Sequence, residues 1–416
     1  MVKNVAVKFF TMFLVLLMLT VPVYAFRSLG YDGTQNALGV EEDVSNQKRE
    51  LRAIWVATVY GLDYPLAGAT TESGVLKKEI VEMLDNIQGM GFNTVFFQVR
   101  PAADALYPSK IFPWSKYLTG NQMTSPDKNF DPLEFIIAEA HKRNIEIHPW
   151  INPYRITMKS SGLDELAYDH PAILHPEWVV ASGSGDKIRH YFNPGIPEVE
   201  QMILDGVSEI VENYDIDGIH LDDYFYPGKV FNDADTYAQY GGEYDNIGDW
   251  RRSNIDNLIK KMYNVVKEKD ENLQFGVSPF AIWANSSSNP LGSDTKGKES
   301  YYNMYADTRG WVKAGYLDYI MPQIYWNIGY EVADYEKILN WWSDVVADTD
   351  VDLYIGQAAY RAGNTDPNSP WYGVDQLRAQ VNLNRVTDNV GGYAMFRYGT
   401  LVRKPELVGF MQEINR

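Results

Sequence analysis

The sequence lacks cysteine, and histidine and basic residues are scarce. Without cysteine the 416-residue chain has no disulfide, no thiol nucleophile and no cysteine-ligated zinc site. None of its six histidines forms a His-x-x-x-His pair, the spacing with which a helix presents zinc ligands. Lys and Arg number 37 against 55 Asp and Glu, and a chain with a net charge of −18 binds polyanions poorly. We therefore expect no cofactor, no metal and no nucleic-acid partner.

Long apolar runs are also lacking, except at the N-terminus. A positively charged start precedes an apolar stretch from Phe9 to Val23, and Val23-Tyr24-Ala25 fits a cleavage site. The stretch is shorter than the roughly 20 residues of a membrane-spanning helix. The pattern predicts a signal peptide over residues 1–25 and a polar linker over 26–48, with an uncleaved anchor as the alternative. We expect the mature protein to be secreted or periplasmic, at the cell envelope, without a membrane partner.

The remaining chain, residues 49–416, alternates β-rich apolar runs with amphipathic stretches. Eight strand–helix units predict the α/β class and a single (β/α)8 TIM barrel with long βα loops. An open doubly wound sheet is the alternative, but no Gly-x-Gly-x-x-Gly fingerprint follows the first strand. The predicted strands span residues 51–59, 93–100, 145–152, 217–222, 274–279, 319–325, 353–360 and 392–398. The predicted helices span residues 74–88, 132–142, 197–212, 253–269, 300–314, 334–347, 374–385 and 404–415.

Three segments that follow predicted strands are long, at residues 152–197, 224–250 and 286–298. In a TIM barrel such loops build the active-site face, so their length favours a large ligand. Aromatic residues make up 14% of the chain. A barrel core can absorb many of them, whereas Tyr and Trp on exposed loops would suit the apolar C–H faces of sugar rings.

Polar and aromatic residues gather where five of the predicted strands end. A buried polar group must be hydrogen-bonded or face a cleft, and a satisfied polar layer would explain one or two such residues but not this many. We therefore expect these side chains to bind substrate. They are Arg100, Asp104, His148, Trp150, Asn152, Tyr224, Gln323, Tyr325, Trp326 and Gln357.

The pair Asp222-Asp223, at the end of the fourth predicted strand, is the catalytic candidate. Facing carboxylates raise one another's pKa, so one of them can hold a proton at neutral pH. Glycoside hydrolysis needs such an acid for the leaving oxygen. Strand alternation places His220, Asp222 and Tyr224 on one face, and Asp223 on the other unless the chain turns there. A helix N-cap or a calcium ligand is the alternative interpretation of the pair.

Several motifs together resemble one known family. Over residues 51–398 the chain is similar to the glycosyl-hydrolase-like barrel family of secreted bacterial proteins that includes the divisome-localised peptidoglycan glycosidase. The resemblance implies a barrel that acts on glycan strands containing N-acetylhexosamine, with peptidoglycan the leading case. The matching motifs are Leu51-Arg-Ala-Ile-Trp-Val, Gly91-Phe-Asn-Thr-Val-Phe-Phe-Gln-Val-Arg-Pro-Ala-Ala-Asp104, His148-Pro-Trp-Ile-Asn-Pro-Tyr154, Asp217-Gly-Ile-His-Leu-Asp-Asp-Tyr224 and Tyr319-Ile-Met-Pro-Gln-Ile-Tyr-Trp326.

The segment from Asp217 to Tyr224 also resembles, more distantly, the chitinase motif Asp-Gly-x-Asp-x-Asp-x-Glu. Asp217 and Asp222 match its first and third acids, whereas His220 replaces the second. Tyr224 stands where the acid Glu belongs, so the usual proton donor is missing. The resemblance implies substrate-assisted catalysis in which Asp222 orients an acetamido group. Asp223, or a loop carboxylate such as Asp104, would then donate the proton.

These observations predict a secreted glycoside hydrolase that cleaves amino-sugar glycan, most directly peptidoglycan. Two other functions fit the same residues. One is a carbohydrate-binding barrel without catalysis, because Tyr224 replaces the acid. The other is a hydrolase of neutral polysaccharide in which Asp222 attacks the sugar.

Overall fold

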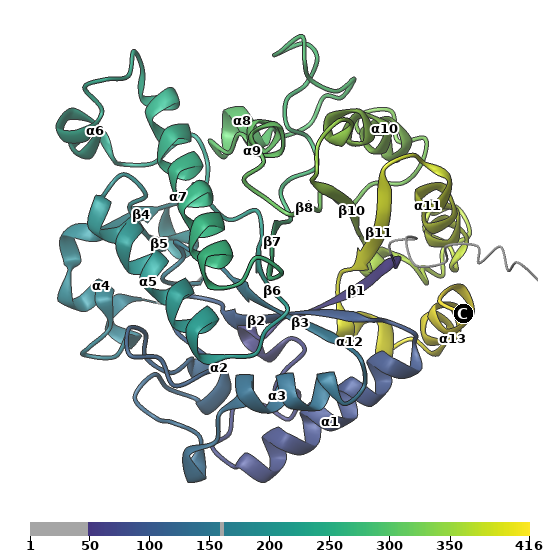
Figure 1. The fold of residues 1–416 in the computed structure, drawn as a ribbon, viewed down its shortest axis with the longest axis horizontal. Helices are drawn as coiled ribbons and strands as arrows, with labels where there is room; N and C mark the ends of the chain where they lie inside the picture. Colours follow the sequence, from purple (N-terminus) through teal and green to yellow (C-terminus); the bar gives the residue numbers. More distant parts are fainter. Residues whose placement is uncertain (1–48, 159–161) are drawn as a thin grey trace, which may run out of the picture. The chain divides into compact units, whose positions relative to one another are not determined.

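Parallel strands close into a barrel in the computed structural model, which describes residues 49–158 and 162–416 (Figure 1). The strand order is β11-β1-β2-β3-β6-β7-β8-β10-β9, and pairing of β10 with β11 closes the ring. Strands β8 and β9 both pair with β10 and form the two halves of one barrel strand, which is interrupted at Pro322. The predicted eight-stranded TIM barrel is thus confirmed. Its strands are β1 (Leu51–Val56), β2 (Thr94–Arg100), β3 (Glu146–Ile151), β6 (Gly218–Leu221), β7 (Gln274–Val277), β8 (Tyr319–Ile320), β9 (Gln323–Ile324), β10 (Asp352–Gln357) and β11 (Val390–Met395).

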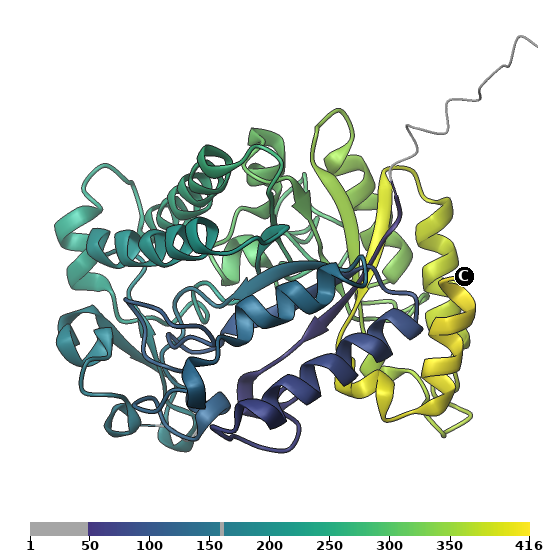
Figure 2. The same ribbon diagram turned by 60° about the horizontal axis from the view of Figure 1, so that its bottom comes forward.

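Helices follow the strands and surround the barrel (Figures 1 and 2). The N-terminus of α3 shows why they begin where they do: the Asp131 carboxylate accepts the backbone N–H groups of Leu133 and Glu134 at 2.9 and 3.1 Å. The helices are α1 (Ser73–Gly89), α2 (Lys116–Thr119), α3 (Pro132–His141), α4 (Pro171–Leu174), α5 (Pro197–Asn213), α6 (Ala234–Tyr240), α7 (Ile247–Lys269), α8 (Ser300–Asn303), α9 (Thr308–Ala314), α10 (Tyr335–Val346), α11 (Asp375–Val386), α12 (Tyr398–Val402) and α13 (Pro405–Ile414).

Two helices differ from the sequence prediction. Helix α7 begins at Ile247, earlier than the predicted residue 253, because the Asn246 side chain caps it by accepting the Asp249 N–H at 3.0 Å. The predicted helix over 300–314 is two helices, α8 and α9. Between them Tyr305 has a φ of 52°, which ends the first helix, and the Asp307 side chain caps the second.

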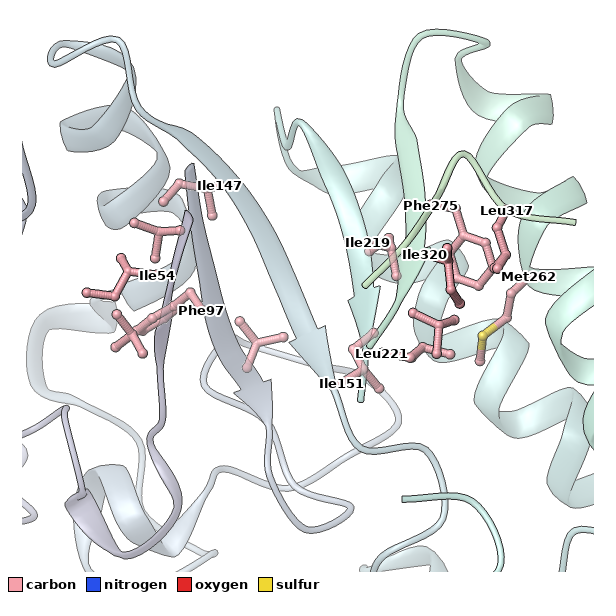
Figure 3. Packing of buried hydrophobic residues seen from close by; sticks show 14 of the residues in the cluster. Ile54, Phe97, Ile147, Ile151, Ile219, Leu221, Met262, Phe275, Leu317 and Ile320 are labelled. Atoms are coloured by element: carbon pink, nitrogen blue, oxygen red, sulfur yellow. The ribbon is translucent and has the colours of Figure 1, made fainter. Parts of the chain in front are cut away.

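The strands bury both faces, and two clusters of apolar side chains result. Between strands and helices, alternate residues of the strands pack against the helices, as Ile219 and Phe275 do beside Met262 of α7 (Figure 3). Inside the barrel a second cluster combines large rings with small residues, so that the rings fit across the narrow interior. This inner cluster comprises Leu51, Ala53, Trp55, Ala57, Phe96, Trp150, Tyr319, Met321, Tyr354 and Ala394.

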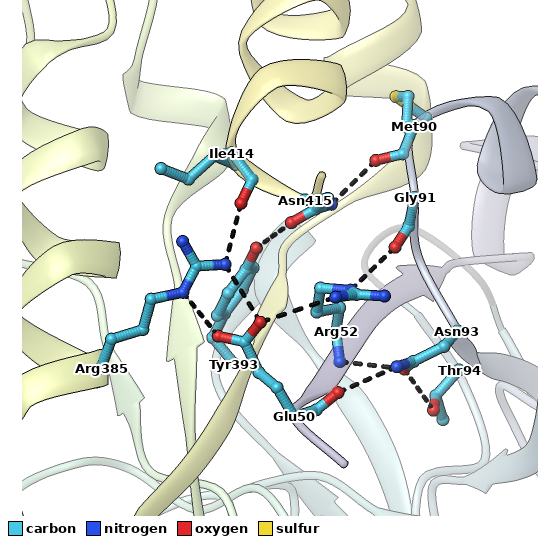
Figure 4. A network of polar contacts seen from close by, with 10 residues as sticks. All are labelled: Glu50, Arg52, Met90, Gly91, Asn93, Thr94, Arg385, Tyr393, Ile414 and Asn415. Atoms are coloured by element: carbon cyan, nitrogen blue, oxygen red, sulfur yellow. Dashed lines mark hydrogen bonds and ion pairs between the residues drawn. The ribbon is translucent and has the colours of Figure 1, made fainter. Parts of the chain in front are cut away.

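Polar contacts join the first and last parts of the described chain (Figure 4). Arg385 of α11 pairs with Glu50, just before β1, at 2.7 and 3.0 Å. The Asn415 amide donates to the Met90 carbonyl at 2.8 Å. Gly91 follows with a φ of +78°, and a Cβ there would lie 2.7 Å from that of Asn415. This contact between the first and last parts of the described chain therefore requires glycine at residue 91, and it fixes β11 beside β1.

The long segments after β2, β3 and β6 carry small elements of their own. The segment after β3 contains α4 and an antiparallel hairpin of β4 (Val179–Ser182) and β5 (Arg189–Phe192). Within the part of the chain that the structure describes, no helix has the length and apolarity to span a bilayer. The signal peptide and linker predicted over residues 1–48 lie outside the described residues. Single 3₁₀ turns occupy Val59–Gly61, Asp127–Asn129, Leu163–Glu165, Pro176–Trp178, Gly185–Lys187 and Ala359–Arg361.

Candidate active site

A cavity of about 300 Å³ lies at the carboxyl ends of the barrel strands, the face that holds active sites in this fold. Aromatic rings form most of its apolar wall, and two adjacent carboxylates supply its acidic groups. This mixture of apolar surface with a few convergent polar groups is typical of a small-molecule or saccharide site. We call it the cleft. Its lining residues are Trp55, Ala57, Val59, Tyr60, Leu62, Gln98, Trp150, Arg155, Met158, Asp222, Asp223, Tyr224, Ser278, Gln323, Tyr325 and Phe396.

The two carboxylates share the cleft because strand β6 ends at Leu221, just before them. Past the strand, alternation no longer sends neighbours to opposite faces. The backbone turns there, and the Asp222 carboxylate accepts the Tyr224 N–H at 3.1 Å. The sequence predicted that Asp223 would share a face with Asp222 only if the chain turned here, and the structure shows this turn.

Asp222 accepts hydrogen bonds from two donors. Its Oδ2 accepts the side-chain amide of Asn152 at 2.5 Å, and its Oδ1 accepts the Tyr224 N–H. Burial raises the pKa of Asp222, whereas the Arg155 charge, these hydrogen bonds and the Trp150 indole lower it. The donors therefore stabilise the ionised form and fix the orientation of the carboxylate.

The pKa of Asp223 is also raised, and here a neighbouring negative charge adds to the effect of burial. Burial, followed by the negative charge of Asp222, raises the pKa of Asp223 to about 7. The Gln323 side chain and the Arg155 charge only partly offset this rise. Neighbouring carboxyl groups with pKa values pushed apart are the arrangement in which one acts as acid and the other as base or anion. Burial raises the pKa of both groups, but Asp223, with a pKa of about 7, is the candidate acid, and Asp222, which has more donors, is the candidate anion.

A chain of buried hydrogen bonds keeps Asn152 aimed at Asp222. The Asn152 Oδ1 accepts from Gln98 Nε2 at 2.7 Å and from Arg155 Nη2 at 2.8 Å, so its amide nitrogen must face the carboxylate. Gln98 is fixed in turn, because its Oε1 accepts the Thr58 and Val59 N–H groups at 2.9 and 3.0 Å. Each side-chain amide therefore has a single consistent orientation.

Below the cleft, hydrogen bonds run into the barrel interior. The Trp55 indole donates to His220 Nε2 at 3.1 Å, and His220 Nδ1 lies 3.0 Å from the Tyr319 hydroxyl. Burial lowers the pKa of His220 well below its usual range, so the ring is neutral. Because the indole can only donate, the proton of His220 resides on Nδ1. The Tyr319 hydroxyl then donates to His148 Nδ1, 3.1 Å away.

Three tyrosines stand at the cleft. Tyr224 and Tyr60 are 41% and 53% exposed, while the Tyr325 hydroxyl is buried and has no hydrogen-bond partner within the described protein. The guanidinium of Arg155 lies 4.9 Å from the centre of the Tyr224 ring. The charge of Asp223, then burial, raises the pKa of Tyr224 to about 12. Tyr224 therefore stays protonated at neutral pH and offers a ring and a hydroxyl to a ligand.

The structure brings together seven of the twelve predicted site residues. Six line the cleft, and Asn152 contacts Asp222 directly from behind the lining. The six are Trp150, Asp222, Asp223, Tyr224, Gln323 and Tyr325.

The other five lie elsewhere, contrary to the expectation that they line one cleft. Arg100 is buried outside the barrel, with its guanidinium 4.2 Å from the Phe112 ring centre. Gln357 also points outward, and its Nε2 donates to the Tyr335 hydroxyl at 3.2 Å. Trp326 packs against the outer core.

His148 and Asp104 occupy other cavities. His148 faces the barrel interior near the amino ends of the strands, where it lines a cavity with Glu146 and Asp217. Asp104 lines a small cavity beside Tyr117, and burial raises its pKa to about 6. Asp104 is therefore not placed to serve as the proton donor of the cleft.

Several cleft residues were absent from the predicted set. Gln98 and Arg155 belong to the quoted motifs or directly follow them, so their position was a usable signal. Trp55 also belongs to a quoted motif, but it lies within a hydrophobic strand, as Phe396 lies within another apolar run, and neither residue type differs from those of the core. Across residues 49–158 and 162–416, no three His, Asp or Glu side chains are gathered closely enough to hold a metal ion.

The chain belongs to the glycosyl hydrolase-like 10 family. The family model matches residues 50–373, which contain the whole lining of the cleft except Phe396. Two named relatives share substantial sequence. Glycosyl hydrolase YngK of Bacillus subtilis is 46% identical over 364 residues, which cover 86% of this chain and 70% of that protein. Glycosyl hydrolase DigH of Escherichia coli K12 is 41% identical over 377 residues, covering 86% of this chain and 84% of that protein.

Solved structures agree with the barrel architecture. The glycoside hydrolase domain of PgaB (BpsB) from Bordetella bronchiseptica superposes with a TM-score of 0.53 at 12% identity, covering 88% of this chain and 98% of that one. Alpha-L-fucosidase isoenzyme 2 from Paenibacillus thiaminolyticus gives the same TM-score at 14% identity, covering 88% and 49%. At these identities the likeness establishes the fold alone. The family resemblance seen in the motifs is confirmed by the family match.

Proposed function

We propose that the protein is a glycoside hydrolase that cleaves glycan strands containing N-acetylhexosamine, with peptidoglycan as the first substrate to test. The observation that carries the proposal is the buried carboxyl pair of the cleft, in which burial and the charge of Asp222 raise the pKa of Asp223 to about 7 while Arg155 and Asn152 favour the ionised form of Asp222. The aromatic wall formed by Trp55, Trp150 and their neighbours supports a sugar ligand.

The proposed reaction assigns one role to each carboxyl group. Asp223 protonates the glycosidic oxygen as the bond to the anomeric carbon breaks. The carbonyl oxygen of the substrate's own acetamido group attacks that carbon, and Asp222 accepts the acetamido N–H and stabilises the positive charge that develops. Asp223, now ionised, then takes a proton from water, which opens the cyclic intermediate. The Tyr325 hydroxyl, buried without a partner in the described protein, is available to the substrate.

Two substitutions and three polymers test the proposal. Asp222→Asn and Asp223→Asn should each lower turnover of purified peptidoglycan by roughly two or more orders of magnitude, the scale of positioned acid–base groups. A thiazoline mimic of the cyclised intermediate should inhibit, because enzymes bind such species more tightly than substrate. Activity on starch in place of peptidoglycan and chitin would favour a neutral-polysaccharide hydrolase. Full activity of well-folded Asp222→Asn and Asp223→Asn proteins would refute the assignment.

We also propose that the protein is exported to the cell envelope or medium, on the basis of the N-terminal charge and apolar pattern. Sequencing the N-terminus of the protein recovered from the extracellular or periplasmic fraction tests this. A mature form that begins near residue 26 is expected. Recovery of the intact chain in the cytoplasm would exclude export.

A further inference from the structure

A second and larger hollow lies away from the cleft, where the segment after β2 meets the segment after β3. It has a volume of about 610 Å³, and we call it the distal groove. Its wall combines aromatic rings, exposed apolar side chains and a few polar groups. The lining residues are Ser109, Lys110, Ile111, Phe112, Pro113, Trp114, Gln122, Met123, Tyr168, Asp169, Pro171, Leu174, His175, Trp178 and Met202.

Large apolar side chains are unusually exposed in the distal groove. Tyr168 is 76% exposed, Met123 69% and Leu174 60%. Trp178 carries the His175 ring stacked at 3.9 Å with an interplanar angle of 9°, which extends its flat surface. Exposed apolar surface gathered in one hollow marks a binding site rather than ordinary surface scatter.

The two segments that form the distal groove are held together, so the hollow is preformed. Lys116 pairs with Glu165 at 2.6 Å across the junction, and Gln122 accepts the Ala167 N–H at 3.0 Å. The Ser109 hydroxyl donates to Glu209 of α5 at 2.5 Å and holds the other edge. Binding there would need little ordering of the chain, which favours affinity.

Charge in the distal groove is low and balanced. Lys110 and Asp169 supply one charge of each sign among the lining residues, beside the His175 imidazole. Recognition in the distal groove therefore depends little on charge pairing and mainly on flat apolar faces with isolated polar groups, which suit the pyranose rings of a glycan strand. Aromatic residues with one polar end suit such a ligand.

Aromatic residues also connect the distal groove with the cleft. Tyr60 at the cleft contacts Tyr117 edge-on, with ring centres 5.5 Å apart. Tyr117 lines the small cavity next to Asp104, which shares Met158 with the cleft and Gln122 with the distal groove. Among the described residues, the small cavity therefore borders both hollows through shared lining side chains.

We propose that the distal groove binds sugar units of the same glycan strand, remote from the bond that the cleft cleaves. The identity of this strand, a glycan containing N-acetylhexosamine, is taken from the proposed function, on which the inference therefore rests. It makes the protein selective for long strands, because a short oligosaccharide in the cleft gains nothing from Trp178 and Tyr168.

Binding measurements with a catalytically disabled protein test the proposal. In an Asp223→Asn background, affinity is measured by calorimetry for chitobiose and for peptidoglycan glycan strands freed of peptide. The long strands should bind more tightly than chitobiose. Tyr168→Ala and Trp178→Ala should each weaken the long strands about tenfold, the effect of an interface anchor. Tyr168→Trp, which keeps an aromatic ring at this position, should bind the long strands as tightly as the protein with Tyr168. Tyr240→Ala removes a 41% exposed tyrosine outside both hollows and should leave the affinity unchanged.

Tyr168 is the decisive position because its exposure makes its removal harmless to folding, whereas Trp178 also packs against the core. Unchanged affinity of Tyr168→Ala for long strands would overturn the proposal. Displacement by a free stem peptide, without binding of peptide-free strands, would overturn it in favour of a peptide site. Hydrolysis is not required in these measurements. Loss of long-strand binding in the groove variants, with no cleavage by the wild-type protein, would therefore refute the proposed function and leave the distal groove standing.

Discussion

The pH dependence of cleavage follows directly from the environment of Asp223. If this residue donates the proton, kcat/KM must be high while Asp223 is protonated and must fall as the pH rises through its pKa of about 7. About half of the molecules carry the proton at pH 7, and about one per cent at pH 9, so activity at pH 9 should be about one hundredth of the plateau. On the acid side, activity falls when Asp222 takes up a proton.

Replacing Asp222 should move the alkaline limb in a defined direction. Its negative charge is the second-largest cause of the raised pKa of Asp223, after burial. In Asp222→Asn that charge is gone, so Asp223 ionises at lower pH and the alkaline limb of the residual activity shifts downward. The shift is partial because burial remains. Asp223→Asn should remove the alkaline limb altogether and leave a low rate that still falls on the acid side, where Asp222 takes up a proton.

The assay is kcat/KM on one soluble glycan between pH 4 and 10, for wild type and both variants. Far-ultraviolet circular dichroism at each pH establishes that the fold is intact. An alkaline limb that persists unchanged in Asp223→Asn would show that another group donates the proton. An unshifted limb in Asp222→Asn would show that the two carboxyl groups do not interact as their burial and proximity imply.

Three further substitutions follow from the same geometry. Arg155→Lys should raise the pKa of Asp222, because the guanidinium that contacts both Asn152 and Pro101 is lost. The acid limb of kcat/KM should then move to higher pH, and an acid limb that stays in place would contradict this. Trp326→Ala should lower the free energy of unfolding in urea titrations by less than the roughly 3 kcal/mol that truncating a fully buried ring costs, because Trp326 is only partly buried, and glycan affinity should be retained. Burial raises the pKa of Asp256 to about 7, so this group stabilises the fold fully below pH 3.8 and loses that contribution as the pH rises through 7. Asp256→Asn should therefore gain stability over wild type at pH 8 by roughly 1–3 kcal/mol and gain almost nothing at pH 4; equal gains at both values would refute the assignment.

The barrel could be predicted because its signal is carried by every strand–helix unit. The predicted run at residues 274–279 and the observed β7, Gln274–Val277, begin at the same residue, and the others agree within a few residues. Helix boundaries depended on single caps that composition did not reveal. Asn246 falls within a predicted loop, although its side chain begins α7.

Membership of the cleft was harder to predict, because it depends on which face of a strand a residue occupies. Strict alternation would place Gln98 and Arg100 together, but the pairing of β2 with β3 shifts register between them, and Arg100 turns outward. Gly206 of α5 accommodates it: a Cβ there would lie 2.2 Å from the guanidinium. Nothing in the residues around Arg100 indicates this bulge.

Whether a side chain reaches the cleft depends on its position along the strand as much as on the face of the strand that it occupies. His148, Trp150 and Asn152 alternate along β3 as predicted, yet only the last two reach the cleft, and His148 lies near the opposite end of the barrel. Gln357 does not line the cleft because its side chain lies on the outer face of its strand. A Cβ on its neighbour Gly356 would lie 3.1 Å from the Trp55 ring inside the barrel, so Gln357 must face the helices.

Burial raises the pKa of both adjacent carboxyl groups, but their hydrogen-bond donors and neighbouring charges differ. Asp222 receives Asn152, the Tyr224 N–H and the nearby Arg155 charge, all of which favour ionisation. Asp223 has fewer donors and is next to the ion that Asp222 forms. Tyr224, in the position of the acid of the chitinase-like motif, is kept protonated by the charge of Asp223, with a pKa of about 12, and is too weak an acid to donate at neutral pH. Under the proposed mechanism, Asp223, one residue earlier in the chain, therefore supplies the proton in place of the glutamate, and Asp222 supplies the anion.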